Sequence, residues 1–380
     1  MSGLNRRDFL AGAAATTLRQ PANAQAGVEP VTVGMVGTGA RGGFLLDAIL
    51  PFPGVVIKAL CDIKPDRLDK AASKAARDNP ATYSDYRKIL DRQDIHAVWI
   101  ATPCDLHVEM AIAALKAGKH IYLEKPVGIT PESIRELLRA AKGRKTVFQT
   151  GHVMRSYPYL KAGVARLRDG VAGKVLTVRA WRHSSSAFSP NPNMSSADWY
   201  TDVRRSGDLI VENAIHNLDV CNWFADSRPD LAAGFGGTLM KNEPPGRINT
   251  DCYTLSYEYA NGVKMSFTQL GFHPSGLPHG GQGFQIYGTE GAVDVVYANV
   301  GKMIFYSRVS GAKPEVLSES ADSAPQDHHF HAFFDAVRAG KTDVAGGLEV
   351  GATAALTSIM GREAFTRKKI MTWREMGVEI

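Results

Sequence analysis

The clearest candidate binding site in this sequence is a glycine-rich turn that is followed, about twenty residues later, by an acidic residue. The β-type run Val31–Val36 leads into Gly37-Thr38-Gly39-Ala40-Arg41-Gly42, and a second run ends at Asp62. Glycines at these spacings allow a tight turn and a close approach of the backbone to a pyrophosphate, which the next helix meets with free N–H groups. A carboxylate about twenty residues further on can bind the ribose hydroxyls. The sequence therefore predicts a dinucleotide-binding site.

A lysine after a later strand has the right type and place to exchange a substrate proton. Glu124-Lys125-Pro126 follows the run His120–Leu123. Lys125 is therefore expected at the carboxyl end of a parallel strand, where ligands of doubly wound sheets bind. Partial desolvation beside a cationic nicotinamide ring should lower its pKa, which suits proton exchange with a substrate hydroxyl. The alternative is a surface lysine paired with Glu124.

Glu212 and His216 form a second candidate pair, in the other half of the chain. Their spacing of four places them on one face of a helix expected over about Asp208 to Phe224, and Asp219 extends that face. Imidazole titrates near neutrality and can take a hydroxyl proton while hydride leaves the same carbon. A carboxylate one turn away could orient the ring. The alternative is a buried structural histidine.

Further polar and aromatic residues are weaker candidates for substrate contact, because ordinary structural use explains each at least as well. They are His152, Arg155, Tyr157, Arg182, His183, Trp199, Tyr200 and Asp219. The cluster His328, His329 and His331 has metal-like residue types. It opens an amphipathic helix, however, so packing and solvent exposure explain it better, and no metal site is predicted.

The elements that must position these residues change in kind near residue 151. Before it, strands alternate with helices, which predicts a parallel, doubly wound Rossmann sheet over residues 27–150. After it, the period-two run Val175–His183 and longer β-runs separated by hairpin turns predict an α+β unit with a large, open, mostly antiparallel sheet over residues 151–380. The fold class expected is α/β, in two domains.

The amino-terminal residues have the pattern of an export signal. Arg6-Arg7 resemble the paired arginines of a twin-arginine signal, and Ala22-Asn23-Ala24 after an Ala-rich run suits signal-peptidase cleavage. Residues 1–26 are therefore predicted to be removed by export to the periplasm, with the twin-arginine machinery as a partner. The run is too short for a membrane anchor, and a disordered cytosolic tail is the alternative.

Charge and cysteine usage exclude some partners. Losing three arginines and one aspartate with the signal lowers the formal net charge from +6 to +4 (6 − 3 + 1), with no basic stripe among aromatics, so nucleic acid is not predicted. No later run reaches the length of a transmembrane helix. The four cysteines are far apart in apolar contexts, which predicts free thiols.

Taken together, these motifs make the chain resemble the Gfo/Idh/MocA oxidoreductase family. The resemblance rests on Gly37–Gly42, on Ala101-Thr102-Pro103 with His107, on the run from Ala117 to Pro126, on Gly151-His152 with Arg155, and on Gly207-Asp208-Leu209 leading to His216 and Asp219. It implies a Rossmann domain followed by an open sheet, often in a homodimer or homotetramer. The family usually has Asp where Glu212 stands. The cofactor contacts expected are Gly37, Thr38, Gly39, Ala40, Arg41, Gly42, Asp62, Thr102, Pro103, His107, Glu124 and Lys125.

Three functions follow from this resemblance and from export. The first is an oxidoreductase, with Lys125 and His216 as catalytic residues, that passes hydride between a sugar or cyclitol carbon and a tightly bound nicotinamide cofactor. The second is a redox-neutral, NAD-dependent glycoside hydrolase that oxidises a ring carbon transiently and eliminates the aglycone. The third is a non-catalytic binding protein. Asp62 would repel a 2′-phosphate and therefore favours NAD. Lys64 and Arg67 are close in sequence and could bind that phosphate, so NADP is the alternative cofactor.

Overall fold

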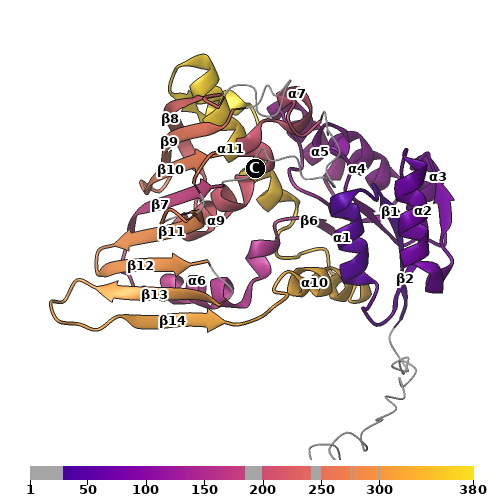
Figure 1. Cartoon of the computed structure of the whole chain (residues 1–380), viewed down its shortest axis with the longest axis horizontal. Coiled ribbons are helices and arrows are strands. Elements are labelled where there is room, and N and C mark those ends of the chain that lie inside the picture. Colours follow the sequence, from indigo (N-terminus) through magenta and orange to yellow (C-terminus); the bar gives the residue numbers. More distant parts are fainter. Residues whose placement is uncertain (1–28, 185–198, 241–249, 275, 279, 298–299) are drawn as a thin grey trace, which may run out of the picture.

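The amino-terminal half of the computed structural model is a six-stranded parallel sheet in the order β3-β2-β1-β4-β5-β6 (Figure 1). The structure describes residues 29–184, 199–240, 250–274, 276–278, 280–297 and 300–380, so the predicted signal at residues 1–26 lies outside it. The chain order reverses between β1 and β4, which places a ligand crevice at the carboxyl ends of these strands. The strands are β1 (Val31–Val36), β2 (Val55–Cys61), β3 (Ala81–Tyr83), β4 (Ala97–Ile100), β5 (His120–Leu123) and β6 (Phe148–Thr150).

Helices cross between these strands as the alternating pattern predicts. Pro131 at the first position of one helix suits a helix start, and the Thr130 side chain before it accepts a hydrogen bond from the Ser133 N–H at 3.2 Å. The short, half-buried strand β3 had no clear signal in the sequence. The crossover helices are α1 (Ala40–Ile49), α2 (Pro65–Lys74), α3 (Arg87–Leu90), α4 (His107–Lys116) and α5 (Pro131–Ala141).

The carboxyl-terminal half carries a nine-stranded sheet in the order β14-β13-β12-β11-β7-β10-β9-β8-β15. Strands β7 and β10 pair in parallel and the other neighbours are antiparallel, so the predicted fold class is confirmed. Buried and exposed residues alternate along β9, as expected for a sheet with one covered face. The strands are β7 (Val175–His183), β8 (Pro229–Gly237), β9 (Cys252–Tyr259), β10 (Lys264–Leu270), β11 (Gly281–Gly288), β12 (Gly291–Val296), β13 (Gly301–Ser307), β14 (Glu315–Ser320) and β15 (Met371–Thr372).

The long helix predicted over Asp208 to Phe224 is wrong in one respect, because the structure divides it. It forms α8 (Leu209–Glu212) and α9 (Ile215–Ala225), with Asn213 and Ala214 between them. In an unbroken helix the Glu212 carbonyl would accept the His216 N–H, but here it accepts Lys125 Nζ at 2.6 Å. A side chain from the other domain thus takes the carbonyl that helix continuation requires. The remaining helices of this half are α6 (Pro158–Arg168), α7 (Val203–Ser206), α10 (Asp327–Arg338) and α11 (Leu348–Arg367).

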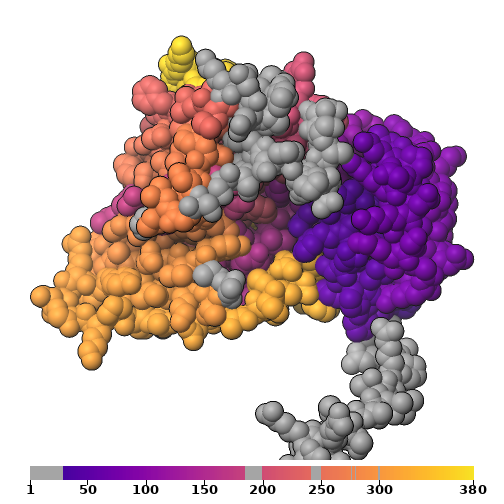
Figure 2. All heavy atoms as spheres, viewed as in Figure 1, coloured from indigo at the N-terminus to yellow at the C-terminus, as the bar shows by residue number. Residues whose placement is uncertain are grey.

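Helix α10 belongs to the second half of the chain but packs on the first sheet. Phe333 and Phe334 on α10 lie 5.5 Å, between ring centroids, from Trp99 on β4, and Trp99 stacks on Tyr122 of β5 at 4.1 Å. Figure 2 shows the two halves in contact, with yellow residues of the late chain against the indigo first half. The first sheet is therefore covered by a helix that begins 177 residues after its last strand ends (327 − 150).

Two sequence expectations concern the interior and the membrane. The four cysteines are free; Cys61, Cys104 and Cys221 are buried and Cys252 is half-buried. Among the helices of the described residues, none combines the length and the apolarity that crossing a bilayer requires.

Candidate functional site

A cleft of about 430 Å³ opens at the carboxyl edge of the first sheet, and the glycine-rich turn forms one wall. Gly37 has φ +85°, and a Cβ there would lie 2.6 Å from the Ala101 carbonyl oxygen. A Cβ on Gly42 would lie 1.9 Å from the Gly37 carbonyl oxygen, so the first turn of α1 can pack on the loop only with glycine at that position. A Cβ on Gly39 would meet only the Arg67 guanidinium. The backbone here is open to a pyrophosphate, as the motif predicts.

Asp62 lies at the end of β2 with its carboxylate already oriented. Its Oδ2 accepts from the Thr38 N–H at 2.8 Å and from Thr38 Oγ1 at 3.2 Å, and its Oδ1 accepts from the Lys64 N–H at 3.0 Å. Carboxylate oxygens can accept further hydrogen bonds, so this residue can bind vicinal ribose hydroxyls. Asp62 lines the cleft. Thr38 does not line it and instead donates the hydrogen bonds that orient the Asp62 carboxylate.

Ile63 also lines the cleft and was missed in the sequence. The residue is 82% exposed, although it lies just beyond Asp62 at the end of the mostly buried strand β2. An exposed apolar residue beside Asp62 offers a surface against which a flat ring such as adenine can pack. The only sequence signal for this role is an isoleucine between two charged residues, Asp62 and Lys64. Without the fold, that pattern does not distinguish a cleft residue from a buried one.

Glu124 is a buried carboxylate beneath the cleft. It is 3% exposed and accepts from Arg41 Nε at 2.6 Å and from the Lys125 N–H at 3.2 Å. Burial by itself would raise its pKa, but the charges of Arg41 and Lys125 outweigh burial and hold the pKa below its usual value. A Cβ on Gly151 would lie 2.6 Å from Glu124 Oε2. Glu124 therefore joins the glycine-rich helix to β5.

Lys125 points across the cleft to the second domain rather than pairing through Nζ with Glu124. Its Nζ donates to Glu212 Oε1 at 2.6 Å and to the Glu212 backbone oxygen, and each side chain of this pair is 13% exposed. Both residues line the cleft. Because a largely desolvated ammonium is held by two acceptors of one residue, its third N–H has a defined direction in which to donate.

His107 braces the backbone on either side of the cleft. Its Nδ1 lies 2.6 Å from the Pro126 carbonyl oxygen and its Nε2 lies 2.9 Å from the Thr102 carbonyl oxygen. The ring thus ties the loop with Thr102 and Pro103 to the segment with Lys125. Thr102, Pro103 and His107 all line the cleft. These motif residues therefore form part of its wall, and His107 also holds the backbone in place.

His216 lies in the first turn of α9, is not among the residues that line the cleft, and makes no hydrogen bond with Glu212. The prediction that Glu212 orients its ring is therefore wrong, because the helix breaks between them and the carboxylate goes to Lys125. Burial, followed by the charge of Lys125, holds the pKa of His216 well below its usual range. A neutral imidazole at pH 7 is a proton acceptor. Its Nδ1 is buried without a partner.

The structure brings few of the other substrate candidates to the cleft. Trp199 and Tyr200 line it, with their rings 5.7 Å apart. The remaining candidates have protein partners. Arg155 forms a bidentate ion pair with Asp219, Arg182 donates to Asn213 and Gln282, His183 contacts Thr268, and Tyr157 stacks on Tyr297. Their contact with a substrate stays a prediction.

The histidine cluster near α10 is divided among separate partners. His328 pairs with Asp322, His329 contacts Ser156 and the Thr150 carbonyl, and His331 stacks on Phe52. Among the described residues, no group of three or more metal-ligating side chains comes together.

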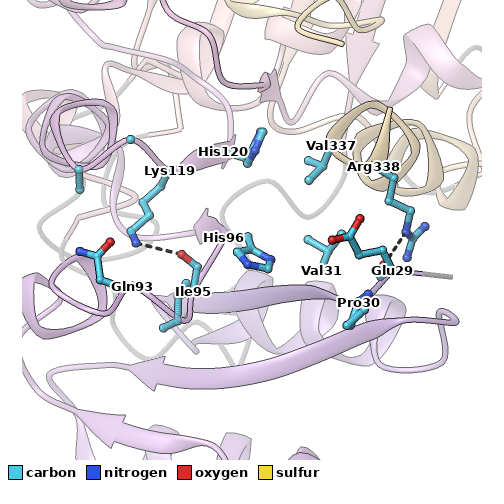
Figure 3. A pocket seen from close by; sticks show the side chains of 12 residues that line it. Glu29, Pro30, Val31, Gln93, Ile95, His96, Lys119, His120, Val337 and Arg338 are labelled. Carbon is cyan, nitrogen blue, oxygen red and sulfur yellow. Dashed lines mark hydrogen bonds between the residues drawn. The ribbon is translucent and has the colours of Figure 1, made fainter. Parts of the chain in front are cut away.

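A second hollow of about 330 Å³ lies at the amino-terminal edge of the first sheet (Figure 3). Its two cations already donate to backbone oxygens: Lys119 to Arg92 and Ile95, and Arg338 to Glu29 and Pro53. These cations stabilise strand starts. The chemistry-bearing groups are concentrated at the opposite edge.

Comparison with known families matches both halves of the chain. Residues 31–152 match the oxidoreductase family with an NAD-binding Rossmann fold, and residues 163–294 match the Gfo/Idh/MocA carboxyl-terminal domain. These ranges contain the glycine-rich turn, Asp62, Lys125 and His216.

Individual relatives carry two kinds of name. A levoglucosan dehydrogenase from Pseudarthrobacter phenanthrenivorans is 28% identical over 296 residues, which cover 70% of this chain and 73% of that protein. A glycosyl hydrolase family 109 protein from Saccharopolyspora erythraea is 36% identical over 157 residues, which cover 39% of this chain and only 34% of that protein. The solved structure of a levoglucosan dehydrogenase in complex with NADH has a TM-score of 0.79 at 23% identity, over 90% of this chain and 99% of that one, which shows a shared fold.

Proposed function

Because the chain belongs to the Gfo/Idh/MocA oxidoreductase family, we propose that it transfers hydride between a hydroxyl-bearing carbon of a sugar or cyclitol and a nicotinamide cofactor. One observation carries the proposal. The Lys125 ammonium, held by Glu212, lies in the same cleft as the glycine-rich turn and Asp62. The ammonium and the glycine-rich turn thus lie in one cleft, and the charge of Lys125 also acts on His216.

The cradle fits a dinucleotide on the geometry of its own residues. Gly37, Gly39 and Gly42 leave the backbone open, and Asp62 is oriented by Thr38. Asp62 favours NAD, because its charge would repel a 2′-phosphate, while Lys64 and Arg67 in the same wall keep NADP as the alternative. Bound NAD supplies the acceptor for hydride.

Two side chains of the protein handle the substrate oxygen and its proton. Lys125 donates its remaining N–H to the hydroxyl oxygen, which stabilises negative charge as the proton leaves. His216, neutral at pH 7 because burial and Lys125 lower its pKa, accepts that proton. Glu212 does not act on His216 in this scheme. It holds the ammonium in place.

The proposal is tested with protein purified without added cofactor. Mass spectrometry of the released nucleotide should find NAD, and a screen of free sugars, cyclitols and anhydrosugars including levoglucosan should find one that yields NADH. Lys125→Met should lower kcat by about 10²- to 10⁴-fold. Lys161→Met, at an exposed lysine on α6, is the matched control. Full activity in Lys125→Met protein would refute the catalytic assignment.

A redox-neutral glycoside hydrolase is the second candidate, favoured by the similarity to a glycosyl hydrolase family 109 protein over 157 residues. The same groups would serve, since transient oxidation of a ring carbon needs the same proton acceptor. Release of p-nitrophenol from an aryl glycoside without net NADH would favour this reaction. Stoichiometric NADH from a free sugar would favour the first.

We also propose that the chain is exported to the periplasm by the twin-arginine route and works as a homodimer or homotetramer. The support for export is Arg6-Arg7 with Ala22-Asn23-Ala24, and the support for assembly is family resemblance. Folded export would carry the bound cofactor across the membrane. Cell fractionation of wild-type and Arg6→Lys/Arg7→Lys protein tests export, and light scattering of the purified protein tests assembly. Cytosolic wild-type protein or a monomer would refute the respective part.

A further inference from the structure

Two imidazole rings beside the cleft each have a buried nitrogen without a hydrogen-bond partner. They are Nε2 of His152, which follows β6, and Nδ1 of His216 on α9. The ring centroids lie 6.1 Å apart in an edge-to-face arrangement with an interplanar angle of 65°. His152 is 1% exposed. Buried polar atoms are normally satisfied, so two unsatisfied nitrogens on neighbouring rings require an explanation.

The hydrogen bonds of Thr150 determine the tautomer of His152. Thr150 Oγ1 lies 2.8 Å from the Gly346 carbonyl oxygen, which can only accept, so the hydroxyl proton lies between these two atoms. His152 Nδ1 lies 2.7 Å from the same Oγ1 and must therefore be the donor. A neutral imidazole protonated at Nδ1 has a bare Nε2. The unpartnered nitrogen of His152 is thus a hydrogen-bond acceptor.

We propose that His152 is a positioning residue for His216: Nδ1–H of His216 donates to one bridging water, and that water donates to Nε2 of His152. This fixes His216 in the tautomer whose Nε2 is bare and free to accept the substrate proton. The inference rests on the proposed function for its consequence, but the tautomer itself is a property of the resting protein.

The separation of the rings agrees with a bridge. With 6.1 Å between the centroids, no nitrogen of one ring is within direct hydrogen-bond range of the other ring, so a hydrogen-bonded link between them requires a bridging water. A buried water needs at least two polar partners, and a donor and an acceptor are present. Charged groups surround the pair, namely Lys125, Arg182 and Arg41 near His216, and Asp219, Arg155 and Glu124 near His152. None of them hydrogen-bonds to either nitrogen.

The tautomer determines whether His216 can act as a base. With the proton on Nδ1, Nε2 takes the hydroxyl proton as the C–H bond breaks and its hydride leaves, and the ring becomes an imidazolium that still donates from Nδ1 to the water. With the proton on Nε2, the same nitrogen has no lone pair to accept another. Glu212 cannot make this selection, because its carboxylate binds Lys125.

The test uses the full chain labelled with ¹⁵N-histidine and long-range ¹H–¹⁵N spectra at pH 7.5, without substrate. His216→Gln assigns the His216 signals by their disappearance. Wild-type protein should show Nδ1 of His216 protonated and Nε2 bare. His152→Gln can place an amide oxygen near the former Nε2 and should keep this tautomer. His152→Asn reaches only as far as Nδ1 and should give a tautomer mixture.

Each outcome bears on the inference by itself. A wild-type His216 protonated at Nε2, or an unchanged tautomer in His152→Asn, would overturn it, and the wild-type spectrum decides even if a variant does not fold. Where a substrate is known, His152→Asn should lower kcat by about 10-fold or more with little change in KM, since a wrong tautomer elsewhere costs up to ~10⁴-fold. The expected tautomers without any sugar turnover would refute the proposed function and leave this inference standing.

Discussion

At the scale of single residues, the cleft depends on groups whose partners are already in place. Asp62 is oriented by Thr38, Glu124 by Arg41, and Lys125 by Glu212. Such preorganisation lowers the cost of ordering side chains when a ligand binds.

Asp62→Asn should weaken NAD binding by about 10-fold or more, because a hydrogen bond to a charged group contributes about 1.5–3 kcal/mol. It should also narrow the preference for NAD over NADP, because the charge that repels a 2′-phosphate is lost. Fluorescence titration with both dinucleotides measures this. Asp66→Asn, at an exposed residue in the first turn of α2, is the control. Tighter NADP than NAD binding in wild-type protein would refute the role of Asp62.

The pH dependence of activity should reflect His216. Its pKa is lowered, chiefly by burial and then by the charge of Lys125, so it stays neutral when the pH falls through the usual range of a histidine near 6.5. We therefore expect kcat/KM to be flat from pH 8 to about 6.5 and to fall only at lower pH. A profile from pH 4.5 to 8 measures this. An acid limb with its midpoint at or above pH 6.5 would contradict the assignment.

At the scale of elements, contacts between the two halves determine the local structure of each. Lys125 Nζ donates to the Glu212 carbonyl oxygen, which would otherwise accept the hydrogen bond that continues α8 into α9. Helix α10 packs on the aromatic residues of β4 and β5. The divided helix turns Glu212 toward Lys125 and leaves the ring of His216 facing His152. An unbroken helix would have paired Glu212 with His216 instead.

Phe333→Ala should lower the free energy of unfolding by about 3–5 kcal/mol, because a fully buried aromatic is removed from the cluster around Trp99. Urea denaturation followed by tryptophan fluorescence measures this. Asp335→Ala lies on the same helix with a side chain 73% exposed, and should change the free energy by less than about 0.5 kcal/mol. Equal effects of the two variants would show that α10 does not stabilise the first sheet.

At the scale of the whole molecule, buried neutral histidines link stability to pH. His152 and His329 are buried, and burial lowers the pKa of each. His329 joins α10 to β6 through the Thr150 carbonyl, and its pKa is lowered to about 4. Below pH 6.5 the unfolded chain binds protons at these residues that the folded chain does not.

The free energy of unfolding should therefore fall as the pH drops from 7 toward 4. His329 alone contributes roughly 3 kcal/mol to this loss, because each pKa unit is worth about 1.4 kcal/mol. Urea denaturation at a series of pH values measures the slope, which His329→Gln should reduce. An unchanged slope in His329→Gln would contradict the linkage.

Much of the fold was predictable because its signals are local. The alternation of strands and helices, the period-two strands and the hairpin turns each depend on a few neighbouring residues. The strands that were missed, β3, β14 and β15, are short or have largely exposed residues, so they lack the apolar alternation that indicates a strand. The division of α8 from α9 was missed because its cause lies in another domain.

By itself, the order of residues determined the glycine-rich turn, the carboxylate after β2 and the lysine after β5, because strand, turn and following helix are built from one continuous segment. Only the tertiary structure decided that Glu212 pairs with Lys125, which is 87 residues away, and that His152 faces His216. The physical reason is that periodicity shows which face of an element a residue occupies. It does not show which group of another element will reach that face, and the packing of the two domains settles that.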